Sequence, residues 1–201
     1  MAENIIINRK ENPVLLDRII QDIQDSLCNR LNWLDKAFGR AYKLVEHGYN
    51  GDKLIYPAAY IGKSEYVSLL PNDNFGNFMW FDIYDPQNID NTASPIPQFS
   101  FTGALVFWYD ASTIYNDDSV TYTEEIKDEI IRVLMTPGLL KQGRLTINKI
   151  YERFENIYKG YSVEKMYTRE DIDKQFFMHP YAGVRIEFEI ITRELCQQFI
   201  R

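Results

Sequence analysis

The sequence predicts an α+β fold in which an antiparallel β-sheet is covered by a long N-terminal helix and by one or two later helices. Three observations lead to this prediction. Apolar residues recur at helical spacing over residues 16–34, aromatic and branched residues dominate residues 54–109, and residues 181–195 alternate between apolar and charged side chains. No linker or internal repeat interrupts the chain, so residues 1–201 are expected to form a single domain.

The N-terminal helix has a clear predicted start. Asn12 can cap a helix, and Pro13 suits the first helical position because its missing N–H has no helical partner there. The apolar stripe comprises Leu16, Ile19, Ile20, Ile23, Leu27, Leu31 and Leu34. We expect the helix to run to Lys36 or, past Gly39, to Glu46.

The remaining elements follow from local composition. We predict strands over residues 54–61, 65–70, 78–84, 99–109 and 181–195, and helices from Thr123 and over 146–160. Residues 85–98 contain three prolines and little apolar content, so they are predicted to form a long loop. A loop of this length is a candidate interaction arm.

Charge is distributed unevenly along the chain, which has a net charge of −7. Between Lys63 and Lys127 there are ten acidic residues and no basic residue, so the rest of the chain sums to +3. One interpretation is that these acids only solvate loops and strand ends. The other is an acidic surface that meets a basic partner or repels DNA. The candidate residues for that surface are Asp110, Asp117, Asp118, Glu124 and Glu125.

Signatures of enzyme chemistry are missing from the sequence. It has only two histidines, and it contains no phosphate-binding glycine motif, no nucleophile elbow and no metal-ligand spacing. We therefore predict no catalytic, cofactor-binding or metal-binding residues, and we do not expect an enzyme. The net negative charge argues against a protein whose main task is to bind nucleic acid, and no segment has the length and hydrophobicity of a membrane span.

Aromatic residues are numerous, with 14 Tyr, 12 Phe and 3 Trp. They are expected to project from both faces of the predicted sheet, so each face must be covered by another part of the structure. One cover is expected to be the helices, and the other is either a neighbouring subunit or simply a large core rimmed by tyrosines. The candidate subunit or ring interface comprises Phe75, Phe78, Trp80, Asp85, Ile89, Ile96 and Trp108.

Several strings resemble the ring-forming head–tail connector, tail-completion and tail-terminator proteins of tailed bacteriophages, particularly those of crAss-like phages that infect Bacteroides. The resemblance rests on residues 31–42 (LNWLDKAFGRAY), 56–60 (YPAAY), 65–67 (EYV), 71–74 (PNDN), 78–86 (FMWFDIYDP) and the strand at 181–195. It implies a tail-terminator-like fold without catalytic residues. It also implies a structural virion protein, made in the bacterial cytoplasm, that forms a homo-oligomeric ring at the head–tail interface or in the tail.

In such a ring, DNA passes through the lumen without specific binding, and the neighbours are the portal, an adjacent ring or tail proteins. Two other functions remain open at this point. One is a non-virion binding module that recognises a peptide or carbohydrate on its aromatic-rich sheet. The other is an enzyme without a recognisable motif.

Overall fold

The structure is a computed structural model, and it describes residues 5–47, 51–71, 73–90, 97–117, 119–141, 143–163 and 178–192. Of these residues, 43% lie in strands and 24% in helices. The strands are β1 (Ile5–Ile6), β2 (Lys36–His47), β3 (Lys53–Gly62), β4 (Glu65–Ser68), β5 (Phe78–Ile83), β6 (Asn88–Asp90), β7 (Gln98–Asp110), β8 (Arg144–Tyr151) and β9 (Tyr181–Thr192). The helices are α1 (Leu16–Arg30), α2 (Ala111–Tyr115), α3 (Thr123–Leu134) and α4 (Phe154–Ile157), with a 3-10 turn at Asp73–Phe75.

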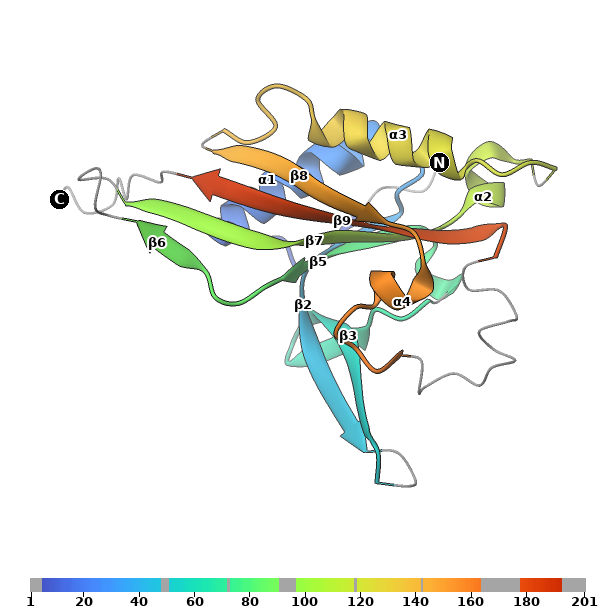
Figure 1. The fold of residues 1–201 in the computed structure, drawn as a ribbon, viewed down its shortest axis with the longest axis horizontal. Coiled ribbons are helices and arrows are strands. Elements are labelled where there is room, and N and C mark those ends of the chain that lie inside the picture. Colours follow the sequence, from blue (N-terminus) through green and yellow to red (C-terminus); the bar gives the residue numbers. More distant parts are fainter. Residues whose placement is uncertain are drawn as a thin grey trace.

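All nine strands belong to one mixed sheet (Figure 1). The strand order is β4-β3-β2-β5-β7-β9-β8, with β1 beside β2 and β6 beside β7. β2 runs parallel to both β5 and β1, whereas the other pairs are antiparallel. β2 is central to this arrangement because its first half pairs with β5 and its second half pairs with β3.

The predicted fold class is therefore wrong. The sheet is mixed instead of antiparallel, and the chain is mostly β, with four short helices in place of one long N-terminal helix. α1 ends at Arg30, residues 31–35 connect it to the sheet, and residues 36–46, which the longer of the two predicted helices would have included, lie in strand β2. The helix predicted over 146–160 is mostly strand β8, followed by the single turn of α4.

β-bulges explain both of these errors. In β2 the register shifts between Ala37 and Arg40, and in β8 it shifts between Ile147 and Lys149. An extra residue in a strand places same-face side chains three positions apart instead of two. Ile147 and Ile150, for example, stand opposite Phe188 and Ile186 of β9, so a strand reproduces the three-residue spacing of a helix.

Both faces of the sheet are covered by the chain itself. α1 and α3 cover one face (Figure 1), and the core there includes the fully buried Ile23, Leu27 and Ile130. The other face carries a second core around Phe78, Trp80, Trp108, Ile157 and Tyr158, which α4 and part of β3 help to close. The sheet is thus the middle layer between two separate apolar cores.

The hairpin of β2 and β3 projects from the body on the side of the sheet away from α1 and α3 (Figure 1). β4 pairs with the base of β3. Within the segment predicted as the loop 85–98, Asn88–Asp90 form strand β6, which pairs with β7, and β7 itself begins at Gln98. Residues 91–96 lie outside the described residues. Among the residues that the structure describes, no helix is long and apolar enough to cross a membrane.

Candidate interaction surfaces

The aromatic residues proposed for a subunit interface lie mainly inside the chain. Phe78, Trp80 and Trp108 are at most 1% exposed, and the ring of Phe78 contacts both tryptophans at centroid distances of 5.6 Å. Their cover comes from this same chain, because Tyr158 stacks on Trp80 at 5.8 Å and Tyr181 stacks on Trp108 at 5.3 Å. Half-buried Phe75 packs against the same core. These four side chains therefore stabilise the fold of the single chain.

The other candidates of that set lie at the surface or outside the described residues. Asp85 and Ile89 are exposed, and Ile89, at 64%, is the most exposed large apolar side chain of the described residues. Together with Val14, Arg40 and Phe99 it lines a groove of about 340 Å³. Ile96 lies outside the described residues. Of this candidate set, only Ile89 lines that groove.

Two of the candidate acids organise the chain around α2. The carboxylate of Asp110 caps the helix by accepting hydrogen bonds from the backbone N–H of Ser112 at 2.9 Å and from its hydroxyl at 2.6 Å. Asp117 accepts a hydrogen bond from the Tyr122 hydroxyl at 2.5 Å and another from the Ser119 N–H at 2.9 Å. These donors, the Tyr122 hydroxyl above all, lower the pKa of Asp117 to about 2. Its charge is thus fixed at neutral pH.

The remaining candidate acids lie at the start of α3. Glu124 and Glu125 are exposed in the first turn, where carboxylates interact favourably with the helix dipole. Glu124 pairs with Lys127 at 2.6 Å, whereas the structure shows no ion pair or hydrogen bond from Glu125 to any described residue. Asp118 lies outside the described residues. Within the described part of the chain, Glu125 is therefore an exposed carboxylate without a basic partner.

One acid of the acidic stretch, Asp82, is buried in the folded chain. Asp82 on β5 is paired at 2.7 Å with Arg185 of β9, whose side chain is 1% exposed, and it also accepts a hydrogen bond from the Tyr161 hydroxyl at 3.1 Å. Arg185 also donates to the Tyr84 hydroxyl at 2.5 Å and to the Ile157 carbonyl at 2.9 Å. Burial alone would lower the pKa of Arg185, but the Asp82 carboxylate more than offsets this and raises it. The acidic stretch is thus not one continuous surface.

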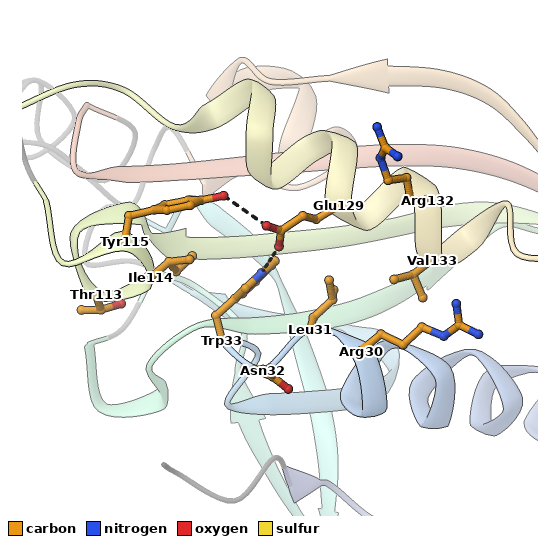
Figure 2. A pocket seen from close by; sticks show the side chains of 10 residues that line it. All are labelled: Arg30, Leu31, Asn32, Trp33, Thr113, Ile114, Tyr115, Glu129, Arg132 and Val133. Atoms are coloured by element: carbon orange, nitrogen blue, oxygen red, sulfur yellow. Dashed lines mark hydrogen bonds between the residues drawn. The ribbon is translucent and has the colours of Figure 1, made fainter.

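Figure 2 shows a pocket of about 530 Å³ between the end of α1, α2 and α3. Glu129 points into its centre and accepts hydrogen bonds from the Trp33 indole N–H at 2.9 Å and from the Tyr115 hydroxyl at 3.2 Å. Burial, followed by the charge of Glu129, raises the pKa of Tyr115 to about 12. Arg30 and Arg132 lie at the rim. Each oxygen of this carboxylate thus already accepts a hydrogen bond from an aromatic side chain of the same chain.

We define the α2–α3 shoulder as Tyr115, Asp117, Tyr122, Glu125 and Glu129. Tyr115 and Tyr122 stack at a centroid distance of 4.1 Å, and Glu125 lies near enough to contribute to the raised pKa of both hydroxyls. The shoulder therefore combines a pair of aromatic rings with three carboxylates, and the pocket lies beside it. Among the described residues, no group of three or more His, Cys, Asp or Glu side chains is arranged to hold a metal ion.

A second aromatic surface lies on the projecting hairpin. We define the tyrosine face as Tyr42, Tyr60 and Tyr66, whose rings meet with centroid distances of 5.7 Å between Tyr42 and Tyr66 and 5.3 Å between Tyr60 and Tyr66. Tyr42 and Tyr66 are each 47% exposed. Strand register brings them together, since Tyr60 stands opposite Tyr66 and Tyr42 stands opposite Ala58.

Sequence reasoning missed this surface. The strands predicted at 54–61 and 65–70, joined by a short turn, were enough to place Tyr60 opposite Tyr66. Tyr42 could not be added, because residues 36–46 were expected to be helical. The tyrosine face therefore depends on the strand identity of β2.

The hairpin has the opposite charge to the acidic stretch. Residues 36–63 contain five Lys and Arg residues against two acids, a net charge of +3. Arg40 lies at the base of the tyrosine face and lines two grooves, one with Tyr42 and Tyr60 and one with Ile89. In the part of the chain that the structure describes, the Arg40 guanidinium has no ion pair or hydrogen bond.

Comparison with known proteins gives no family assignment, since no family model matches the chain and no curated protein matches it significantly.

Proposed function

We propose that this protein is a structural subunit of a homo-oligomeric ring in the virion of a tailed bacteriophage, at the head–tail connector or in the tail. DNA passes through the lumen of that ring. The proposal combines the sequence resemblance with the surfaces described above. It requires no catalytic group and no cofactor.

The observation that carries the proposal is the projecting hairpin of β2 and β3. It extends from the body (Figure 1) and exposes large apolar side chains on both of its faces, with Tyr42 beside Tyr66 of β4 on one face and Val45 and Ile61 on the other. Large apolar side chains gathered on a projecting element favour a contact surface, because water-exposed apolar area is reduced when a partner covers it. An element of this shape suits a subunit that reaches a neighbour.

The charges fit the same proposal. A closed ring with head-to-tail contacts needs two different complementary patches on each chain. Residues 36–63, which contain the hairpin and the first residue of the following turn, carry +3, whereas the stretch between Lys63 and Lys127 carries −10. The overall charge of −7 also favours passage of DNA over its capture, because like charges repel.

The alternative of a peptide-binding or carbohydrate-binding module has less support. It depended on aromatic side chains presented by the sheet, and Phe78, Trp80 and Trp108 are buried by the chain's own residues. The sheet does present Tyr42, Tyr60 and Tyr66, and these rings suit a ligand as well as a neighbouring subunit, so they do not favour this alternative over the ring.

Multi-angle light scattering across a concentration series, combined with negative-stain electron microscopy, tests the proposal. The expected result is a species of several subunits whose population grows with concentration, seen in images as closed rings with a central hole. A strict monomer over the whole series would contradict ring assembly. A compact dimer with no hole would contradict it as well.

A further inference from the structure

We propose that the tyrosine face and Arg40 of one copy dock on the α2–α3 shoulder of a second copy. This inference rests on the proposed ring function and names the contact that would build the ring. The occupant of the tyrosine face is thus another copy of the same chain. The argument has four steps.

The first step is that the tyrosine face has the composition of an interface core. Tyrosine and arginine are enriched among residues that dominate binding energy, because each combines a large apolar body with a polar end. The three rings are already in contact with one another, so little side-chain freedom remains to be lost when a partner covers them. Arg40 supplies a charge that no described residue of the same chain neutralises.

The second step is that the shoulder is complementary to this face. It presents two stacked tyrosines and three carboxylates, and Glu125 is a charge without an ion pair among the described residues. Val120, in the loop between α2 and α3, is 52% exposed and adds apolar area. Arg40 and Glu125 therefore suit one another as an ion pair across an interface with aromatic rings on both sides.

The third step is that one chain cannot make this contact with itself. Arg40, Tyr42 and Tyr60 line a groove with Asp17 and Ile20 in the first half of α1, whereas Tyr115 and Glu129 of the shoulder line a pocket with Arg30 at the end of α1. In Figure 1, α2 and the start of α3 lie at one end of the body, away from the hairpin. The two surfaces differ, so the contact is head-to-tail, the kind that closes into rings when the rotation between subunits allows it.

The fourth step concerns the open edge of the sheet at β8, the obvious competing contact. β8 has a β-bulge between Ile147 and Lys149 and carries two exposed cations, Arg144 and Lys149. Bulges and cations are features that keep edge strands from pairing with other chains. The hairpin, whose exposed face is aromatic, is the better candidate for contact between copies.

A charge exchange tests the inference. Arg40→Glu and Glu125→Arg each place like charges together across the proposed contact, and each is expected to weaken association by about tenfold or more, measured by light scattering over concentration. The double variant Arg40→Glu with Glu125→Arg restores opposite charges and should recover most of the lost association. Tyr66→Ser removes aromatic area without a charge change and should also weaken association.

A matched control is available on the same hairpin. Lys53→Glu makes the same change of charge as Arg40→Glu, but Lys53 and Tyr60 project from opposite faces of β3 because side chains alternate along a strand. Association of Lys53→Glu should stay close to that of the unchanged protein. Circular dichroism and thermal unfolding check that each variant is folded.

The outcomes separate the docking inference from the proposed function. If rings form and respond to Arg40→Glu but not to Lys53→Glu, and the double variant recovers, the docking inference is supported. If rings form and none of the variants changes them, the docking inference is overturned while the ring function stands. If the unchanged protein never associates, the ring function is overturned and the docking inference with it.

Discussion

Replacing Arg185 by methionine tests the buried polar network on the second face of the sheet. The guanidinium donates hydrogen bonds to Asp82 at 2.7 Å, to the Tyr84 hydroxyl at 2.5 Å and to the Ile157 carbonyl at 2.9 Å. Methionine keeps much of the side-chain length and removes all three donors. Asp82 is then left as a buried carboxylate whose remaining described partner is the Tyr161 hydroxyl.

We expect Arg185→Met to lower the free energy of unfolding by about 3–5 kcal/mol, because breaking one side of a buried ion pair leaves an uncompensated charge. The double variant Arg185→Met with Asp82→Leu removes both charges, so it should be more stable than Arg185→Met alone. Arg144→Met is the control. Arg144 is exposed on β8 and has no ion pair among the described residues, so its loss should change stability by no more than about 0.5 kcal/mol.

Urea unfolding followed by tryptophan fluorescence measures these differences, since Trp80 and Trp108 are buried and become exposed on unfolding. Protein concentration is held fixed because association stabilises the folded state. A loss of less than about 1 kcal/mol for Arg185→Met would refute the reasoning that the pair is desolvated. A double variant less stable than the single Arg185→Met variant would refute it too.

Three further predictions concern the core and the titrating groups. Leu27→Ala should cost about 2–5 kcal/mol in urea unfolding, because this side chain is fully buried between α1 and the sheet; a cost below about 1 kcal/mol would contradict that packing. Burial raises the pKa of both Tyr84 and Tyr115 to about 12, so tyrosinate absorbance between pH 10 and pH 12 should be lower for the folded protein than in urea, and identical curves would disprove it. The pKa of Asp117 is lowered to about 2, so its stabilising effect is present above its ordinary pKa near 4 and is lost as pH falls toward 2. The stability difference between the unchanged protein and Asp117→Asn, measured by thermal unfolding, should therefore shrink over that range, and a constant difference would argue against the bond from Tyr122.

Local chemistry was enough to predict several elements. α3 starts at Thr123, directly before the two acids that suit its first turn, although the N-cap position is occupied by Tyr122, which makes no side-chain capping hydrogen bond. β9 starts at Tyr181, where alternation begins. The aromatic strands β5 and β7 were also found, with bounds close to those predicted. The side-chain pattern of α3 and β9 matches the period of the element that forms, whereas β5 and β7 are almost continuous apolar runs buried on both faces of the sheet.

Elements containing a bulge could not be assigned in this way. In β2, Phe38 and Ala41 belong to the same core although they are three residues apart, which a strict two-residue alternation does not allow. In β8 the same shift separates Ile147 from Ile150. An apolar spacing of three is shared by a helix and by a bulged strand, and only the neighbouring strands decide between them.

The same distinction between local pattern and tertiary contacts applies to the candidate surfaces. The sequence by itself determined the charge asymmetry, the excess of aromatic residues and the absence of recognisable catalytic motifs, because these depend on composition and local order. Only the tertiary structure decided which aromatic rings are buried and which are exposed. Trp80 is covered because Tyr158, directly after α4, stacks on it, and Tyr66 is exposed on β4, the strand at that end of the strand order. Exposure is a property of contacts between segments distant in sequence, so the chain's local pattern does not contain it.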